Sequence, residues 1–265
     1  MMDYNISDLR NAYENIGVSQ GRIVYVTGNF GRLGRFSSPS KEALFKAHLN
    51  VLSDILGKKG TLVVPTHSFS LANNAMLFDY NNTPSETGPF TEYIRQLPDA
   101  VRQYHPFSSS TAVGGSASSI CGNCSRHVYG LNTPFHRMVE NDALFISLGK
   151  EINTTISLVH HAEFMMGVPY RYTKEFWKSC RKNGEELIEN FYLYVLYSQC
   201  DIARDRNIKI TESYRANHSV LEERLGRSSF YSVPMKSYFD HAVNMMSDDI
   251  YAWLKNPPTK RPYLI

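Results

Sequence analysis

Two short runs, Arg22-Ile-Val-Tyr-Val-Thr27 and Gly60-Thr-Leu-Val-Val-Pro65, decide the fold. Both are apolar without strict alternation and rich in β-branched residues, as expected of strands buried on both faces. The segment between them begins near Ser38, has Pro39 in its first turn, carries apolar residues at helical spacing and ends at Gly57. A strand, a helix and a strand with short joints predict a βαβ unit whose strands are parallel.

Further elements extend this unit in both directions. A helix is expected within residues 1–20, a third buried strand at Ala143-Leu-Phe-Ile-Ser-Leu148, and a closing helix near Met235 to Leu254. Two β-prone runs flank Asn183-Gly184, which is a strong hairpin signal. We therefore expect an α/β fold with a central mixed, largely parallel sheet flanked by helices, and an added antiparallel β-hairpin in the C-terminal half. One domain over residues 1–265 is predicted, with a core at 22–170 and a hairpin and helical part at 171–265.

Composition excludes several classes of protein. The 265 residues are 42% hydrophobic, enough for a full core. Because 28 basic and 25 acidic residues are spread without blocks, nothing indicates a nucleic-acid surface. No run approaches the roughly 18 apolar residues of a membrane span, and the first residues do not resemble a signal peptide. We expect a cytoplasmic protein with four unpaired cysteines, and the sequence is compatible with a homo-oligomer.

The loop after the first strand, Gly28-Asn-Phe-Gly-Arg-Leu-Gly34, is a candidate ligand site. Its glycine spacing differs from the G-x-G-x-x-G dinucleotide fingerprint, which argues against a nicotinamide enzyme. The glycines nevertheless allow a ligand to come close to the backbone at the carboxyl end of a strand, which is where open α/β sheets bind ligands. Arg32 and Arg35 add positive charge there.

The segment Thr155-Ile-Ser-Leu-Val-His-His-Ala-Glu163 places a histidine and a carboxylate close together. If Ser157 is the N-cap and Leu158 begins a helix, His160 and Glu163 share one face. An imidazole can accept a proton near neutral pH, and a neighbouring carboxylate fixes its tautomer. The spacing therefore predicts a general base, although it also fits a buried helix start whose histidine merely satisfies a hydrogen bond.

A set of short motifs follows in a characteristic order. They are Gly60-Thr-Leu-Val-Val-Pro-Thr66, Thr83-Pro-Ser-Glu-Thr-Gly88, Pro98-Asp-Ala-Val-Arg102 with His105-Pro106, Asn132-Thr-Pro-Phe135 and His160-His-Ala-Glu163. The ordered set, from about residue 22 to 170, resembles the aminoglycoside N3-acetyltransferase family, a coenzyme A dependent group with its own α/β fold. The family's H-x-x-E motif follows an N-T-S/T element, and here Asn153-Thr-Thr155 precedes it.

The resemblance implies roles for individual residues. His160 becomes the general base and Glu163 its orienting or substrate-facing carboxylate, so the catalytic pair is His160 and Glu163. The pantetheine arm of acetyl-CoA is placed at Gly28, Asn29, Gly31 and Arg32. There the family often has V-H-S-S-L-S-x-L-G, and two of its serines are Gly28 and Asn29 here. The family's second histidine after His-Pro is Ser108.

Several polar residues are further candidates. Attack of an amine on a thioester creates an oxyanion that needs fixed donors, and we expect groups around Thr66, Ser109 and Ser110 to supply them beside the cofactor. His67, Asp79 and His105 are candidate substrate-binding residues. His67 is equally compatible with a structural loop contact, and Asp79 with an ordinary exposed loop carboxylate.

The predicted function is transfer of an acetyl group from acetyl-CoA to an amino group of an aminoglycoside or related amino sugar. Such a reaction on an aminoglycoside would confer antibiotic resistance. No metal ion is expected to take part. An alternative acceptor is a nucleotide-linked amino sugar of surface polysaccharide biosynthesis, which Arg171, Lys174 and Lys178 would tolerate. A metal-dependent hydrolase using His105, His160, His161 and Glu163 is an alternative of another class. Adjacent histidines on a helix point about 100° apart, which makes a shared ion difficult.

Overall fold

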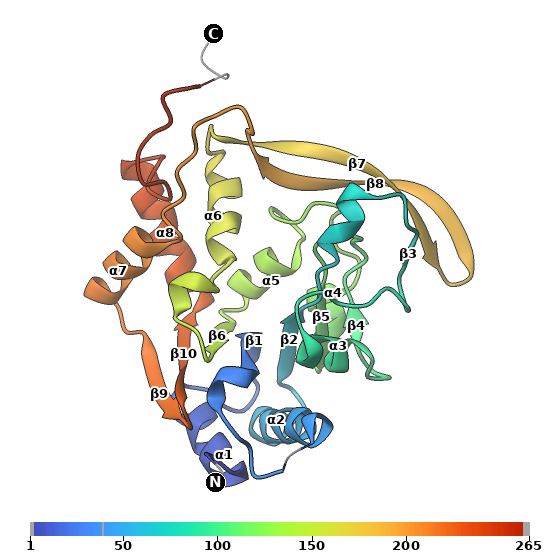
Figure 1. Ribbon diagram of the computed structural model, residues 1–265, viewed down its shortest axis with the longest axis vertical. Helices are drawn as coiled ribbons and strands as arrows, with labels where there is room; N and C mark the ends of the chain where they lie inside the picture. The colour runs from blue at the N-terminus through green and yellow to red at the C-terminus, as the bar shows by residue number, and fades with distance from the viewer. Residues whose placement is uncertain (1–2, 39, 262–265) are drawn as a thin grey trace.

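The central feature of the computed structural model, which describes residues 3–38 and 40–261, is a seven-stranded sheet in the order β4-β5-β2-β1-β6-β10-β9 (Figure 1). Its strands are β1 (Ile23–Gly28), β2 (Thr61–Pro65), β4 (Val101–Arg102), β5 (Ser110–Gly114), β6 (Leu144–Leu148), β9 (Leu221–Leu225) and β10 (Ser228–Pro234). The three central strands β2, β1 and β6 are parallel, and every outer pairing is antiparallel. The expected mixed α/β sheet flanked by helices is confirmed, but the expectation that it is largely parallel is wrong: two of its six pairings are parallel, and the four outer ones are antiparallel.

Helices cover both faces of this sheet. They are α1 (Ile6–Asn15), α2 (Lys41–Leu56), α3 (Pro89–Arg95), α4 (Ala117–Cys121), α5 (Pro134–Glu140), α6 (Leu158–Met166), α7 (Ile208–Asn217) and α8 (Met235–Asp248). Successive side chains of β1 point to opposite faces. Tyr25 therefore joins the core formed with α4 to α8, while Val24 and Val26 join the core formed with α1, α2 and α3.

A separate sheet contains the predicted hairpin. Strands β7 (Arg171–Lys182) and β8 (Glu185–Leu196) pair over their full length, and β3 (Phe78–Asp79) adds to β7 in parallel. Asn183 and Gly184 both have positive φ, 54° and 83°, which suits a two-residue hairpin turn. In Figure 1 the hairpin starts beside the end of α6 and reaches across to the segment around β3. Its inner face packs on Phe107 through Phe176 and Phe191.

The predicted βαβ unit is present. Helix α2 has Ser40 as its N-cap and Gly57 as its C-cap, whereas Pro39 lies outside the described residues. Strands β9 and β10 were not predicted, and after residue 200 a closing helix near Met235 to Leu254 was expected. Strand β10 is interrupted by serines, yet it lies between β6 and β9, with Phe230 and Val233 buried. The sequence could not indicate a pairing between strands so far apart along the chain.

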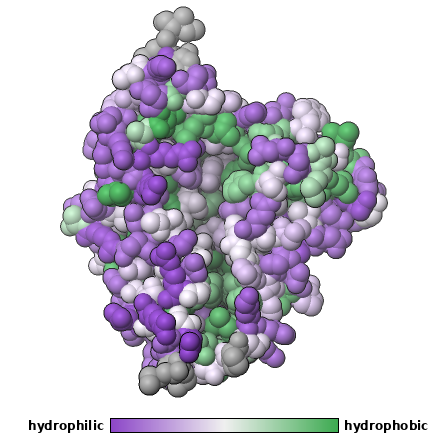
Figure 2. Space-filling view, viewed as in Figure 1, coloured by the Kyte–Doolittle hydropathy of each residue, from purple (hydrophilic) through white to green (hydrophobic). Residues whose placement is uncertain are grey.

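Among the residues that the structure describes, no helix is long and apolar enough to cross a membrane. Figure 2 shows one face of the molecule hollowed along its middle, with hydrophobic side chains visible inside and hydrophilic ones at the rim.

Candidate active site

Helix α6 begins as the sequence predicts, with Ser157 at the N-cap and Leu158 as the first helical residue. It ends at Met166, and its C-cap Gly167 has a φ of 61°, a left-handed conformation that glycine adopts without steric cost. Three residues along a helix bring two side chains onto one face. His160 Nδ1 lies 2.5 Å from Glu163 Oε2, so the two side chains are in direct hydrogen-bonding contact.

The two members of this pair have different environments. The Glu163 side chain is fully buried, whereas 27% of the His160 side chain is exposed. Burial alone would raise the pKa of Glu163, but the charges of His160 and Arg171 and the hydrogen bond with His160 more than offset it, and the pKa lies below its ordinary value. Glu163 is therefore ionised at neutral pH. An ionised carboxylate only accepts hydrogen bonds, so Nδ1 of His160 carries a proton and Nε2 remains available as a base.

A second layer surrounds the pair. Arg171, at the start of β7, forms an ion pair with Glu163 Oε1 at 3.1 Å from its Nε. Trp253 lies edge-on to His160, with ring centroids 5.2 Å apart. The ring centroid of Tyr129 lies 6.0 Å from that of His160. Neither Trp253 nor Tyr129 was predicted from the sequence. A lone aromatic residue near the C-terminus carries no spacing signal that would relate it to α6.

His161 has a different role from its neighbour. It is buried, its Nδ1 accepts the backbone N–H of Gly130 at 3.2 Å, and its ring packs on Phe239. Burial lowers the pKa of His161 to about 3, so the ring is neutral. The helical register assumed from the sequence therefore places only His160 beside the carboxylate.

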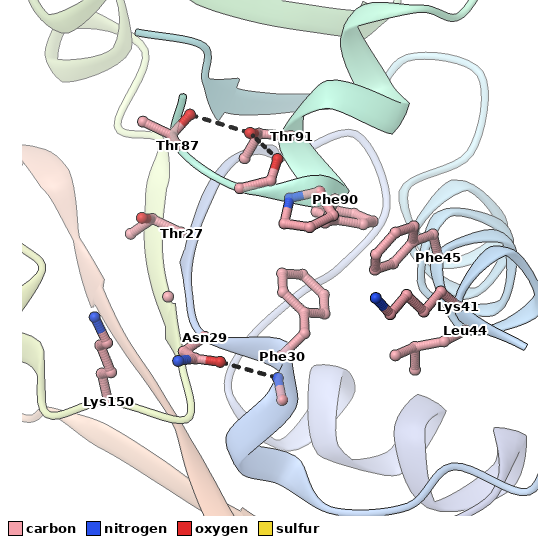
Figure 3. Close-up of a pocket in the computed structure, with 14 residues that line it drawn as sticks. Thr27, Asn29, Phe30, Lys41, Leu44, Phe45, Thr87, Phe90, Thr91 and Lys150 are labelled. Atoms are coloured by element: carbon pink, nitrogen blue, oxygen red, sulfur yellow. Dashed lines mark hydrogen bonds between the residues drawn. The ribbon is translucent and has the colours of Figure 1, made fainter. Parts of the chain in front are cut away.

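The glycine-containing loop after β1 lines a cavity of about 460 Å³ (Figure 3). Gly28, Asn29 and Gly31 form one wall. Gly28 has a φ of 126°, and a Cβ there would lie 2.2 Å from the carbonyl oxygen of Leu148, so only glycine fits. Asn29 accepts the backbone N–H of Gly31 at 3.0 Å, which holds the short helix η1 (Phe30–Leu33) in place.

The rest of the cavity combines aromatic and cationic groups. Phe30 and Phe90 pack at 4.3 Å between centroids, and Phe45 packs on both. Lys41 and Lys150 stand on opposite sides of the cavity (Figure 3). Neither lysine was predicted. Arg32, which was, is an exposed residue of η1 that does not line the cavity. A lysine in the first turn of α2 and another after β6 become neighbours of the loop only through the sheet topology.

The predicted oxyanion donors lie elsewhere. Thr66, Ser109 and Ser110 are almost fully buried and do not line the cavity. The Arg102 guanidinium lies among the first two, donating from Nε to Ser109 Oγ at 3.0 Å and from Nη2 to the carbonyl oxygen of Thr66 at 3.2 Å. Thr66 and Ser109 therefore satisfy a buried arginine, a requirement that the sequence did not reveal.

The three candidate substrate residues contact residues other than His160. His67 Nδ1 contacts Ser108 Oγ at 3.2 Å, and burial lowers the pKa of His67 to about 4. His105 is fully buried and accepts the backbone N–H groups of Phe107 and Ser108 at Nδ1. Asp79 accepts two backbone N–H groups of the following turn and lies 3.6 Å from Arg181.

Within residues 3–38 and 40–261, no group of three or more histidine, cysteine, aspartate or glutamate side chains is arranged to hold a metal ion. His105 and His161 are each engaged with backbone N–H groups of their own surroundings.

Comparison with known proteins gives a consistent result. A family model described as aminoglycoside 3-N-acetyltransferase matches residues 29–247. Aminoglycoside N(3)-acetyltransferase IX of Micromonospora chalcea is 22% identical over 208 residues, which cover 70% of each chain. The crystal structure of aminoglycoside acetyltransferase AAC(3)-Xa shares 19% identity with a TM-score of 0.77, covering 92% of this chain and 93% of that one. A structure of AAC-IIIb in a binary complex with CoASH shares 17% identity, with a TM-score of 0.78 and coverage of 92% and 97%.

Proposed function

Because the chain belongs to the aminoglycoside 3-N-acetyltransferase family, we propose that it transfers the acetyl group of acetyl-CoA to an amino group of an aminoglycoside or related amino sugar. The N-acyltransferase class expected from the sequence agrees with the family. The observation that carries the proposed chemistry is the 2.5 Å contact between His160 Nδ1 and a buried, ionised Glu163.

In the proposed reaction the acceptor reacts as its neutral amine, and Nε2 of His160 removes one N–H proton as the nitrogen attacks. The amine nitrogen forms a bond to the thioester carbonyl carbon, and the carbon–sulfur bond then breaks. The proton passes from the imidazolium to the departing thiolate, which leaves as coenzyme A. Glu163 stabilises the imidazolium between these two transfers. No covalent bond to the protein is needed, and binding both substrates next to each other would contribute to the rate.

The cavity beside Gly28, Asn29 and Gly31 is the proposed site of coenzyme A. Its aromatic wall of Phe30, Phe45 and Phe90 suits the apolar part of the cofactor, and the two lysines suit its phosphates. In support, the solved AAC-IIIb structure with a similar fold was determined as a complex with CoASH. A ligand with both apolar and anionic parts matches this combination of groups.

Fewer observations identify the acceptor amine than identify coenzyme A. The AAC-VIa structure of similar fold (TM-score 0.79, 16% identity, coverage of 92% and 98%) is described as bound to sisomicin. The alternative, a nucleotide-linked amino sugar, would be tolerated by the cations Arg171, Lys174 and Lys178, of which Lys174 is exposed and lies over the Phe176 ring. Arg171 is paired with Glu163, and Lys178 donates to the backbone carbonyls of Leu71 and Asn74 inside the protein. We therefore favour an acceptor without a nucleotide.

A direct test measures release of coenzyme A thiol on mixing the protein with acetyl-CoA and a panel of aminoglycosides, free amino sugars and nucleotide-linked amino sugars. We expect turnover with at least one member of the first two groups, and calorimetric binding of coenzyme A without an acceptor. If coenzyme A does not bind at millimolar concentration, the proposed function is wrong.

A further inference from the structure

The carboxylate of Glu163 is held from two sides. Its Oε2 contacts His160 and its Oε1 lies 3.1 Å from Arg171 Nε. Arg171 is also close to the histidine itself, with Nη2 lying 3.2 Å from His160 Nδ1. Since Nδ1 already carries the proton shared with Glu163, this guanidinium nitrogen is a positive neighbour of the ring and not its hydrogen-bond donor.

Arg171 is fixed by aromatic rings and has little room to move. Its guanidinium carbon lies 4.8 Å from the Trp253 ring centroid and 5.7 Å from that of Tyr194, and its side chain is only 8% exposed. Trp253 is in turn anchored, because its Nε1 donates to Asn207 Oδ1 at 2.5 Å. Asn207 also donates to the carbonyl oxygen of Asn153, just before α6. The C-terminal segment thus connects the arginine to the start of the helix that carries His160.

We propose that Arg171, held by Trp253, is a positioning residue for the His160–Glu163 pair, with two effects. It fixes the orientation of the Glu163 carboxylate toward His160, and its charge opposes protonation of the His160 ring. This inference rests on the proposed function for its consequence in catalysis, but its physical content, control of the proton on His160, does not depend on turnover.

Other groups around the pair do not supply a competing charge near neutral pH. Tyr129 faces His160, while Tyr170 and Tyr194 face Glu163 and Arg171. Burial raises the pKa of all three tyrosines, so they are neutral near pH 7. From α5, His136 faces His161, and α8 meets that same histidine through Phe239. Glu163 and Arg171 are therefore the charged groups that act directly on His160 within the described part of the chain.

The experiment compares Arg171→Met, Arg171→Lys and a control, Arg215→Met. Arg215 is a suitable control because it also forms a 3.1 Å ion pair, with Glu151, and also lies over an aromatic ring, that of Tyr231. The titration of His160 is followed by NMR of the ring nitrogens in the resting protein, and His160→Ala identifies its signal.

Loss of a neighbouring positive charge favours the imidazolium, so Arg171→Met should move the His160 titration upward by about one pH unit. Arg171→Lys keeps the charge without the planar guanidinium, so its titration should stay close to wild type while kcat falls about tenfold. The acidic limb of the kcat/KM profile should move upward in Arg171→Met, and the KM for acetyl-CoA should be unchanged. Arg215→Met should change none of these quantities.

An unshifted His160 titration in folded Arg171→Met would overturn the proposal, and so would an equal upward shift in Arg171→Lys. If Arg171→Met does not fold, Trp253→Leu provides the second test, because it frees the guanidinium without removing its charge. We then expect reduced kcat, and wild-type kcat in this variant would contradict the positioning role. If the titration shifts as expected while no acyl acceptor is ever turned over, the proposed function fails and the control of the His160 proton stands.

Discussion

Two buried arginines, Arg102 and Arg171, have opposite surroundings. Arg102 donates only to neutral oxygens, including the carbonyl of Thr83 at 2.7 Å and the hydroxyl of Ser109, and burial lowers its pKa to about 10. Arg171 faces a buried carboxylate that also contacts a partly exposed histidine. A cation satisfied entirely by neutral acceptors connects loops. A cation that shares a carboxylate with a solvent-accessible imidazole can change how that imidazole holds its proton.

The largest effect is expected at His160, the partly exposed histidine that shares Glu163 with Arg171. His160→Ala should lower kcat by about 100-fold or more with coenzyme A affinity nearly unchanged, because a positioned general base is lost while the cavity remains. Steady-state kinetics and calorimetry measure the two quantities. His161→Ala is the matched control. It should leave kcat of the folded protein largely intact, although loss of the acceptor for Gly130 N–H should reduce stability. The reverse result would require a site built around His161.

The next effect is at the shared carboxylate. Glu163→Gln should lower kcat by about tenfold or more and move the acidic limb of the kcat/KM profile to lower pH. The direction follows because an imidazolium without its carboxylate releases its proton more readily. This is the opposite of the shift expected for Arg171→Met, so the pair of variants separates the two charges. If both variants move the limb in the same direction, electrostatic control of His160 is wrong.

Substitution of Arg102 should lower the stability of the fold and leave the pH dependence of catalysis unchanged. Arg102→Met leaves carbonyl and hydroxyl acceptors in the interior without a donor, which should reduce the free energy of unfolding by about 2 kcal/mol or more. Urea denaturation measures this. Arg181→Met, at an exposed ion pair with Glu186, should change stability by less than about 1 kcal/mol. The pH profile of folded Arg102→Met should match wild type, and a shifted acidic limb would show that Arg102 also affects protonation of His160.

The smallest effect concerns a third kind of cation, the lysines at the cavity, which form no ion pair with the described residues. Lys150→Met should weaken coenzyme A binding by roughly threefold to tenfold at low salt, and the difference should shrink in 0.5 M salt, where screening is stronger. Calorimetric titrations at two salt concentrations test this. Arg32→Met tests the residue chosen from the sequence. If it weakens binding more than Lys150→Met does, the phosphates lie outside the cavity.

The sequence allowed prediction of the parts of the molecule that depend on local pattern. The βαβ unit, the hairpin around Asn183 and Gly184, and the start of α6 at Leu158 all follow from periodicity, caps or turn residues. The contact between His160 and Glu163 follows from helical spacing alone. The roles of these residues in catalysis stay a proposal.

What could not be predicted depends on distant parts of the chain meeting in space. Trp253 reaches His160 because the segment after α8 returns to α6, and no pattern near residue 253 encodes that return. Thr66 and Ser109 were expected at the cofactor because hydroxyls are useful there. Their contacts with Arg102 could only be found once the burial of that arginine was known.

The antiparallel pairing of β10 with β6 has a consequence for the protein while it is being synthesised. Strand β6 leaves the ribosome long before β10, and the whole hairpin and α7 are translated between them. At bacterial or eukaryotic translation speeds the gap is on the order of ten seconds. During that time one edge of β6 has unpaired backbone groups next to an apolar strand, a surface that promotes aggregation. A nascent chain stalled before residue 228 should therefore bind chaperones, and one released after residue 254 should not.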